Sequence, residues 1–413
     1  MIKITLLGGS ALASPLLIES FLKHSPKQSY EFVFQGRSLD KLKAVLKLSK
    51  GFHSLYPETD ISMRMSTDPI DALEGADFVI NQIRVGGLKG RLHDESFPPT
   101  LGIPGEESVG PGSFLNAVRS FPPALSYART CEKYCPNCTW INLTNPSSMV
   151  QYALEKFTTL KVIGICDMPE GLLIDLGNHL GIDWKELEYD WGGMNHLGWL
   201  CGLRHDGKDL FPHLMEELEL IKGLTVEPDL IRAIGAIPAN YLKYYLHPEK
   251  HLFTGKKRHR AEELMDINND MLETMQVWQP GDPLAFLQAR NANWYDWIVA
   301  PLLYLLAEKE SGELILSVPN EGSYPTLPHD AIIEVPAQIK NGEIIALRPA
   351  SLPPLALSLL ERVSAYERQA SEAIVLGNKK LALQALLMNP MIHSYAQTKA
   401  VLENAWQQDK DIH

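Results

Sequence analysis

Two short segments carry the residue types most able to bind a metal ion. Cys166 and Asp167 directly follow an apolar run, residues 162–165, that predicts a buried strand. Asn195 and His196 form a polar pair inside an apolar, aromatic stretch. A thiolate and an imidazole, with positions left open for substrate oxygens, would suit a Lewis-acid divalent ion. Their spacing is not a known ligand repeat, so a buried structural cysteine and a core histidine stay open as alternatives.

Three other cysteines, Cys131, Cys135 and Cys138, are spaced like part of a structural metal site. The sequence offers no nearby fourth cysteine or histidine to complete a tetrahedron. The first two also fit the last turn of a helix that ends at Pro136 and Asn137. The pattern therefore disfavours a structural zinc site.

A glycine-rich turn, Gly8-Gly9-Ser10, directly follows the first predicted strand. Backbone amides in such a turn can approach a pyrophosphate, and the N-terminus of the next helix favours an anion. The segment departs from the usual G-x-G-x-x-G pattern because no further glycine occurs before Gly36. Dinucleotide binding and a plain strand-to-helix turn both remain open on this motif alone.

The end of the second predicted strand bears on which dinucleotide could bind. An acidic residue at this place normally accepts hydrogen bonds from the adenosine ribose. Here the chain reads Gln35-Gly36-Arg37-Ser38, without a carboxylate. Arg37 and Ser38 could hold a 2′-phosphate, or Arg37 could stack on adenine or lie in solvent. The choice between NAD and NADP stays open.

The elements that must position these residues alternate between strand and helix in the first part of the chain. Predicted strands cover residues 2–7, 30–35, 61–65, 76–80, 139–143 and 161–165, and predicted helices cover residues 15–23, 38–50 and 114–134. This alternation predicts the α/β class with a Rossmann-like, doubly wound parallel sheet. Such sheets place their chemistry at the carboxyl ends of the strands, where Cys166 is expected.

The remaining segments predict a long loop and a second domain. Residues 84–112 are rich in glycine, proline and charge, which favours a functional loop over a packed element. After residue 182 the pattern changes to an aromatic strand region, 189–203, and to long helical stretches interrupted by an extended segment, 314–335. We expect a dinucleotide-binding domain over residues 1–182 and an α+β domain for substrate and metal over residues 183–413.

Composition limits the classes of partner. The chain has 413 residues, a hydrophobic content of 45% and a formal net charge of -12. This length and content suit a large buried core, and the negative charge disfavours nucleic acid and anionic membranes as partners. No signal-like N-terminus or membrane-spanning apolar run is visible, and five cysteines are too few for a disulfide framework. We expect a cytoplasmic protein with reduced thiols.

Several motifs, taken in order, resemble glycoside hydrolase family 4 over nearly the whole chain. The matching segments are Gln82-Ile83-Arg84-Val85-Gly86-Gly87, Gly110-Pro111-Gly112, Asn142-Leu143-Thr144-Asn145-Pro146, Cys166-Asp167-Met168-Pro169, Asn195-His196-Leu197-Gly198-Trp199, Ile237-Pro238-Ala239-Asn240-Tyr241-Leu242-Lys243-Tyr244-Tyr245 and Ile333-Glu334-Val335-Pro336. Any one of these motifs is unspecific, but the ordered set is hard to produce by chance.

The resemblance implies a fold related to the lactate and malate dehydrogenases and a glycosidase that needs NAD, or NADP, and a divalent metal such as Mn²⁺. It implies a redox-neutral reaction. Hydride passes from sugar C3 to NAD⁺, a base removes the C2 proton, the aglycone leaves by elimination, water adds to C1, and the hydride returns. The substrate implied is a small sugar or phosphosugar, such as a 6-phospho-glucoside, and the protein is expected to be a homodimer or homotetramer.

The resemblance also implies a role for each matching residue. Cys166 and His196 would hold the metal, Tyr241 would be the C2 base, and Asp167 would be the leaving-group acid, which favours α over β substrates. The implied cofactor contacts are Gly8, Gly9, Ser10, Arg37 and Asn81, and the implied substrate contacts are Arg84, Asn145, Asn195 and Arg260. Without the resemblance, Tyr241 reads as a core aromatic, Asp167 as a residue that orients the metal ligand, and Arg260 as part of a solvated basic helix face.

Three departures from the family pattern keep other functions open. Ser10 replaces a glycine, the segment 35–38 replaces the acidic ribose partner, and Arg290-Asn291-Ala292 replaces an Arg-Gly-Gly-type segment. The alternatives are an NAD(P)-dependent dehydrogenase of the lactate or malate type and a non-catalytic dinucleotide-binding protein. The first alternative lacks a clear His-Asp proton relay with a substrate arginine.

Overall fold

The computed structural model describes residues 1–252 and 258–412, and one large sheet runs through it. Within these residues the main sheet has nine strands, in the order β13-β12-β11-β6-β5-β4-β1-β2-β3. The parallel strands are β1 (Ile2–Leu7), β2 (Tyr30–Gln35), β3 (Ile61–Ser66), β4 (Phe78–Asn81), β5 (Thr139–Asn142) and β6 (Lys161–Gly164). Their apolar residues are mostly buried on both faces, as helical crossovers on both sides require.

Seven helices of the described chain follow or connect these parallel strands. They are α1 (Ser14–Leu22), α2 (Leu39–His53), α3 (Pro69–Leu73), α4 (Gly87–Ser96), α5 (Gly110–Tyr134), α6 (Ser147–Phe157) and α7 (Met168–Leu180). The strand order reverses direction next to β1, which is the topological switch point of doubly wound folds. The predicted Rossmann-like sheet is confirmed.

The prediction of a long loop over residues 84–112 is wrong for much of its length. Helix α4 occupies Gly87–Ser96, a short 3₁₀ helix follows at Pro98–Leu101, and α5 already begins at Gly110. The composition of α4 hides it, because its buried residues, Asp94 and Glu95, are charged rather than apolar. An ion pair with another helix, between Asp94 and Arg119 of α5, holds α4 in place where an apolar stripe would usually do so.

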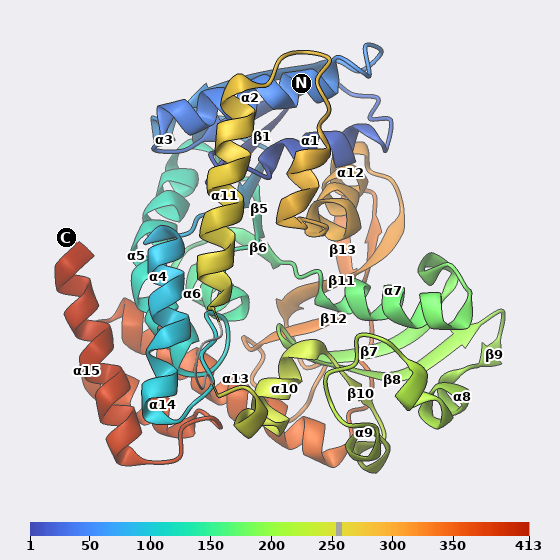
Figure 1. The fold of residues 1–413 in the computed structure, drawn as a ribbon, viewed down its shortest axis with the longest axis vertical. Helices are drawn as coiled ribbons and strands as arrows, with labels where there is room; N and C mark the ends of the chain where they lie inside the picture. Colours follow the sequence, from blue (N-terminus) through green and yellow to red (C-terminus); the bar gives the residue numbers. More distant parts are fainter. Residues whose placement is uncertain (253–257, 413) are drawn as a thin grey trace.

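The second half of the chain both extends the main sheet and builds a smaller one. Strands β11 (Gly312–Pro319), β12 (Ile332–Lys340) and β13 (Glu343–Ala346) continue the main sheet beyond β6 in antiparallel fashion. The smaller sheet has β7 (Glu188–Met194), β8 (Leu197–His205), β9 (Lys208–Asp209) and β10 (Ile237–Pro238). Its strands project to one side, with α7 above them and α8 and α9 nearby (Figure 1).

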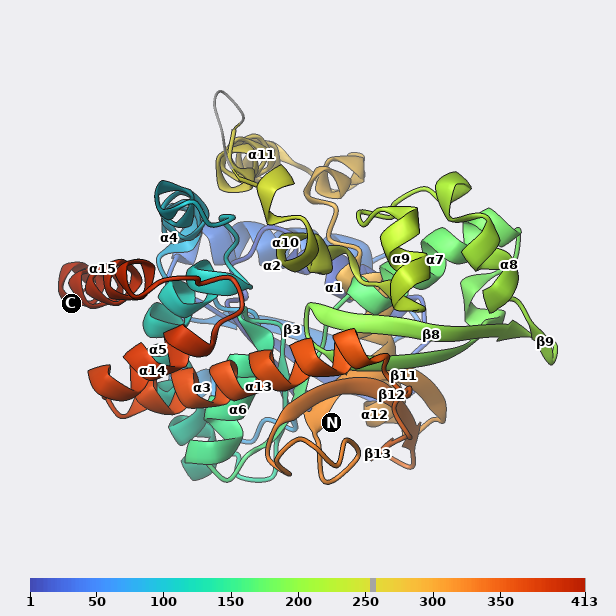
Figure 2. The ribbon, with the colours of Figure 1, turned by 90° about the horizontal axis from the view of Figure 1, so that it is seen from below.

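The remaining helices frame the molecule. They are α8 (Phe211–Glu216), α9 (Pro228–Ile234), α10 (Lys243–Leu246), α11 (Arg260–Val277), α12 (Ala300–Glu308), α13 (Pro354–Val375), α14 (Lys379–Met388) and α15 (Tyr395–Ile412). Helix α11 lies beside α4, and α13, α14 and α15 form a layer next to α5 and α6 (Figure 2). Among the described residues, no helix is long and apolar enough to cross a membrane.

One continuous core ties the two halves together. It contains Ile4 and Phe32 from the parallel strands, Trp199 from the smaller sheet and Val335 from β12. Because a close-packed core transmits position from one element to another, the smaller sheet is held at a defined place relative to the parallel strands.

Candidate active site

The register of the sheet brings five strand ends to one level. Leu7 of β1 is paired with Gln35 of β2 and Asn81 of β4, and Asn142 of β5 links Asn81 to Gly164 of β6. The residues that follow these strand ends line a cavity of about 960 Å³. This volume is at the upper end of the range for small-molecule sites, as a dinucleotide together with a sugar would need.

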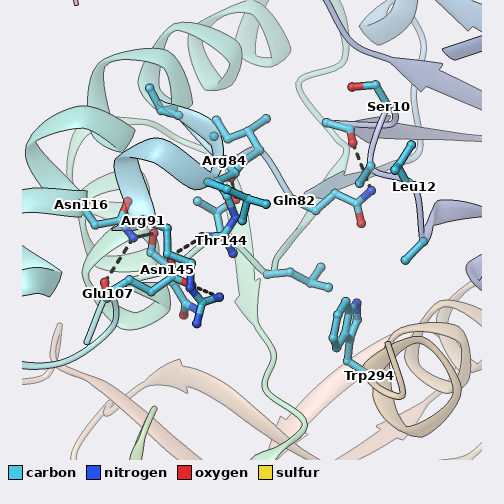
Figure 3. Close-up of a pocket in the computed structure, with 18 of the residues that line it drawn as sticks. Ser10, Leu12, Gln82, Arg84, Arg91, Glu107, Asn116, Thr144, Asn145 and Trp294 are labelled. Atoms are coloured by element: carbon cyan, nitrogen blue, oxygen red, sulfur yellow. Dashed lines mark hydrogen bonds and ion pairs between the residues drawn. The ribbon is translucent and has the colours of Figure 1, made fainter. Parts of the chain in front are cut away.

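The cavity has two walls that differ in character. Figure 3 shows Arg84, Arg91, Glu107, Asn116 and Asn145 gathered on one wall. Ser10, Leu12 and Gln82 lie on the other side, and Trp294 faces both groups from below in this view (Figure 3).

The first loop is shaped to bring backbone amides to the cavity. Gly8 has a φ of +77°, and a Cβ there would lie 2.8 Å from the Gln82 carbonyl oxygen. The backbone N–H groups of Ser10, Leu12 and Ala13 donate no hydrogen bond within residues 1–252 and 258–412. All three residues line the cavity. Free N–H groups at the start of a helix fit the pyrophosphate of a dinucleotide.

His196 lies at the tip of the β7–β8 hairpin and lines the cavity. Asn195 and His196 form the two-residue turn between β7 and β8, and His196 has a φ of +60°, which is unusual for a residue with a side chain. His196 is 6% exposed, and its Nδ1 has no hydrogen-bond partner in the described chain. Burial lowers the pKa of His196 to about 4, so the ring is neutral and able to donate a lone pair.

Cys166 lines the same cavity two residues beyond Gly164, the last residue of β6. Burial, reinforced by the nearby carboxylates of Glu334 and Asp167, raises the pKa of its thiol. A thiol and a neutral imidazole with an unpartnered nitrogen, both lining one cavity, are a donor set that fits a divalent ion of intermediate softness. The chemistry of these residues therefore fits the metal that the sequence predicts.

Tyr241 stacks on the imidazole of His196. It lies in a 3₁₀ turn, Asn240–Leu242, and the two ring centroids are 3.8 Å apart with an interplanar angle of 5°. Burial, with a further contribution from Glu106, raises the pKa of the phenol. No hydrogen bond of the Tyr241 hydroxyl is found in the described chain, so this group is free to meet a ligand in the cavity.

Asp167 is the N-cap residue of helix α7 and follows Cys166 in the chain. Burial raises the pKa of its carboxyl, while Arg290 acts against this shift. A carboxyl with a raised pKa holds its proton to higher pH, as a general acid must.

A group of arginines makes one end of the cavity strongly basic. Arg84 and Arg91 both pair with the buried carboxylate of Glu107, and the Arg91 pair has an N–O distance of 2.9 Å. Arg290 makes no ion pair in the described chain and stacks on Trp294 with its guanidinium 5.2 Å from the ring centroid. Burial and repulsion from Arg84 and Arg91 lower the pKa of Arg290 to about 10. Arg91 also pairs with Glu95 at 2.6 Å, so two carboxylates face three guanidinium groups, and Arg290, which has no carboxylate partner in the described chain, is the cation best placed for an anionic ligand.

Most of the residues predicted from the sequence meet in this cavity. Those that line it are Gly8, Ser10, Arg37, Arg84, Asn145, Cys166, Asp167, Asn195, His196 and Tyr241. Gly9, Asn81 and Arg260 do not line it. Gly9 packs on β2, Asn81 is buried and donates to Asn142 Oδ1 at 2.8 Å, and Arg260 pairs with Glu263 at the start of α11.

Three cavity-lining residues could not be singled out from the sequence: Arg91, Glu107 and Arg290. Arg91 and Glu107 lie inside the segment interpreted as a loop, where charge alone does not single out a residue. Arg290 was noted only as a departure from a family motif. Its signal was available in part, because an arginine beside Trp294 is a common stacking pair.

The three clustered cysteines meet at the far end of α5. The sulfur atoms of Cys131, Cys135 and Cys138 lie within 4.8 Å of one another, and all three residues are buried. In the described chain this group contains no fourth cysteine or histidine. The three sulfur atoms form a group close enough to share a metal ion, and whether they hold one stays a prediction of the sequence.

Comparison with known proteins places both halves of the chain in one family. Residues 3–182 match the family 4 glycosyl hydrolase model, and residues 191–392 match the family 4 glycosyl hydrolase C-terminal domain. A 6-phospho-beta-glucosidase of Thermotoga maritima is 29% identical, with 99% of each chain covered. A phospho-alpha-glucosidase of Clostridium acetobutylicum is 27% identical, covering 87% of this chain and 86% of the relative.

Solved structures agree with this placement. The Thermotoga maritima 6-phospho-beta-glucosidase with manganese, NAD⁺ and glucose-6-phosphate has a TM-score of 0.90 at 28% identity, covering 100% of this chain and 99% of that one. Lactate dehydrogenase of Eimeria maxima has a TM-score of 0.54 at 16% identity, covering 95% and 97%, which shows a shared fold. Because family models match both halves of the chain, over residues 3–182 and 191–392, the chain belongs to family 4 of the glycosyl hydrolases.

Proposed function

We propose that this protein hydrolyses the glycosidic bond of a 6-phospho-glucoside by a redox-neutral mechanism that uses a nicotinamide dinucleotide and a divalent metal such as Mn²⁺. The observation that carries the proposal is the convergence of three kinds of group in one cavity. Free backbone amides lie at the dinucleotide loop, a thiol and an imidazole lie at strand and hairpin ends, and a basic wall lies beside them.

The nicotinamide and the divalent cation would supply the parts of this chemistry that side chains cannot. When bound, the nicotinamide would supply reversible hydride transfer, and the cation would supply Lewis acidity to the sugar oxygens and to the Tyr241 phenol. Cys166 and His196 would hold the cation. Gly8 would allow close approach of the pyrophosphate, and the free amides of Ser10 and Leu12 would bind it.

Two residues of the chain would move protons. The Tyr241 oxygen, as the phenolate that a nearby bound cation would favour, would take the proton from sugar C2, because the Tyr241 ring stacks on His196 and its hydroxyl makes no hydrogen bond within the described chain. The carboxyl of Asp167 would give a proton to the glycosidic oxygen, because burial keeps it protonated to higher pH than an exposed aspartate. Oxidation at C3 makes this C2 proton removable by a side chain.

The basic wall would recognise the 6-phosphate. Arg84 is about one third exposed to the cavity, and the buried Arg290 has no carboxylate partner in the described chain, so both can point guanidinium N–H groups at an anion. Asn145 and Asn195 line the same space and would contact sugar hydroxyls. Arg260, which the resemblance implied as a substrate contact, does not line the cavity and pairs with Glu263. We therefore place the phosphate at Arg84 and Arg290.

A substrate panel tests this function directly. The protein, with a dinucleotide and Mn²⁺, is incubated with nitrophenyl α- and β-glucosides, with and without a 6-phosphate, and nitrophenol and NADH are followed separately. We expect nitrophenol release from a phosphorylated substrate without stoichiometric NADH. Net NADH would indicate a dehydrogenase, and the absence of both signals would contradict the proposal.

Variants at the basic wall test the phosphate assignment. Arg84→Leu and Arg290→Leu should each raise KM for the phosphorylated glucoside at least tenfold, since each removes a charge-assisted contact. Arg260→Leu is the matched control and should leave KM within about twofold. If Arg260→Leu alone raises KM, the phosphate lies elsewhere.

We further propose that the chain divides functionally into a dinucleotide-binding part, residues 1–182, and a substrate and metal part, residues 183–413. The protein would act in a reducing cytoplasm, because all five of its cysteines are free thiols. It would assemble as a homodimer or homotetramer. Light scattering on the purified protein measures this assembly, and a monomer at working concentration would contradict it.

A further inference from the structure

The end of strand β2 presents an unusual surface to the adenosine part of a dinucleotide. Resting on the proposed function, we propose that this part of the cavity is a binding site for a 2′-phosphate, so that the protein selects NADP(H) over NAD(H). The residues of this site that line the cavity are Gln35, Arg37 and Lys41, and Ser38 follows Arg37 in the chain without lining the cavity.

An amide stands where a carboxylate normally binds the ribose. Gln35 ends β2, is 1% exposed and lines the cavity, and its Oε1 has no hydrogen-bond partner in the described chain. A buried, unpartnered oxygen costs free energy unless a ligand satisfies it. A neutral amide can accept a hydrogen bond from a ribose hydroxyl as a carboxylate does. Unlike a carboxylate, it does not repel a phosphate on the neighbouring 2′-oxygen.

Two cations flank this amide. Arg37 lies two residues beyond Gln35, and Lys41 lies in the first turn of α2, so both side chains start from the same corner of the cavity. Both are exposed, and neither makes an ion pair or a side-chain hydrogen bond within residues 1–252 and 258–412. Asp40 also lies in the first turn of α2 but does not line the cavity. The cations are therefore available to a ligand.

The first loop and the start of α2 complete the site. Gly36 brings the end of β2 against the first loop, because a Cβ at this position would lie 3.0 Å from Ser10 Oγ. Ser38 is the N-cap residue of α2, and its side chain makes no capping hydrogen bond. Ser38 does not itself line the cavity, but it borders the cavity-lining Arg37, and the first amides of this 15-residue helix have no side-chain cap and favour a nearby anion.

The charge around the cavity agrees with this assignment. The carboxylates that line it within the described chain are Glu107 and Asp167, and both belong to the end that carries the chemistry. Glu107 is neutralised by Arg84 and Arg91. A phosphate near β2 would meet the charges of Arg37 and Lys41 without an opposing carboxylate, whereas the ribose hydroxyl of NAD would leave both cations unpaired.

Calorimetric titration without metal or sugar tests the inference independently of turnover. NADP⁺, NAD⁺, 2′,5′-ADP and 5′-ADP are titrated into the full-length protein in a phosphate-free buffer of low ionic strength. We expect NADP⁺ to bind roughly 10- to 100-fold more tightly than NAD⁺, as one or two charge-assisted contacts imply. 2′,5′-ADP should exceed 5′-ADP by a similar factor.

Variants assign the preference to the named side chains. The double variant Arg37→Ala/Lys41→Ala should lose at least tenfold in affinity for NADP⁺ and little for NAD⁺, because NAD⁺ has no phosphate to meet these cations. Lys43→Ala is the matched control, since Lys43 is an exposed lysine of the same helix that does not line the cavity. It should change neither affinity.

Three outcomes would overturn the inference. Equal or tighter binding of NAD⁺ would leave the proposed glycosidase intact but remove the 2′-phosphate site. Equal losses for both dinucleotides in the double variant would mean that Arg37 stacks on adenine instead of binding phosphate. Binding of neither dinucleotide would contradict the proposed function together with this inference.

Discussion

Replacing Tyr241 by phenylalanine tests whether this residue acts as a catalytic base or only packs in the core. The ring stack on His196, with centroids 3.8 Å apart, does not need the hydroxyl, and that hydroxyl has no hydrogen-bond partner in the described chain. Its removal should therefore cost less than about 1 kcal/mol of unfolding free energy. For a chain of this size, such a change lowers Tm by at most about 2 to 4 °C.

The effect on turnover should be far larger. Loss of a general base typically lowers the rate by roughly 10² to 10⁴, which corresponds to about 2.7 to 5.4 kcal/mol of transition-state stabilisation. The assay measures kcat on a nitrophenyl 6-phospho-glucoside and Tm on the same preparation, with dinucleotide affinity as a check that the cavity is intact. Affinity should stay within about twofold of the wild type.

Tyr244→Phe is the matched control for this measurement. Tyr244 is a near neighbour in the chain, with its ring centroid 5.9 Å from that of Tyr241, and its hydroxyl donates to Glu106 Oε2 at 3.4 Å. It does not line the cavity. We expect a small loss of stability and near-normal turnover in this variant. Near-normal turnover in Tyr241→Phe would refute the reasoning and leave the reaction without its base.

Three further perturbations test other parts of the structure. Cys166→Ser should abolish binding of one divalent ion per chain, with Tm unchanged, and retained metal content by elemental analysis would refute the assignment. Gly8→Ala should lower the unfolding free energy by about 1 to 2 kcal/mol and weaken dinucleotide binding, because the new Cβ meets the Gln82 carbonyl at positive φ; unchanged Tm and affinity would contradict this. Burial raises the pKa of Glu367 from 4.5 to about 8, although Ser148 donates to it. Its contribution to stability is therefore full below about pH 4.5 and is lost as pH rises through 8, at up to about 1.4 kcal/mol per pH unit. Glu367→Gln should flatten this fall in urea unfolding, and an unchanged pH slope would count against it.

The parallel strands could be predicted because local sequence decides them. The apolar runs around Ile4, Phe32 and Ile163 are bounded by glycine or polar residues, and they fill the core. The glycine turn after β1 could be placed from the strand and the helix on either side of it. Cys166 lies in the cavity because the parallel strands end at the same level, and chemistry in such sheets is expected at their carboxyl ends.

Other parts of the site depend on contacts that no local pattern shows. Helix α4 lacks an apolar stripe, and the bidentate pair between its buried Asp94 and Arg119 of α5 helps to hold it in place. The aromatic strand region was predicted without its turn, although that turn aims His196 at the cavity. The basic wall joins Arg91, Glu107 and Arg290 from distant segments, so it exists only in the folded chain.

The loss of a label from substrate C2 tests the central claim most directly. A 6-phospho-glucoside carrying deuterium at C2 is hydrolysed in ordinary water with the dinucleotide and Mn²⁺, and the released sugar is analysed by mass spectrometry. If Tyr241 removes the C2 proton, the abstracted deuterium exchanges with solvent, and the product should lose the label. Full retention of deuterium in the released sugar would contradict the account and point to direct displacement by a pair of carboxylates.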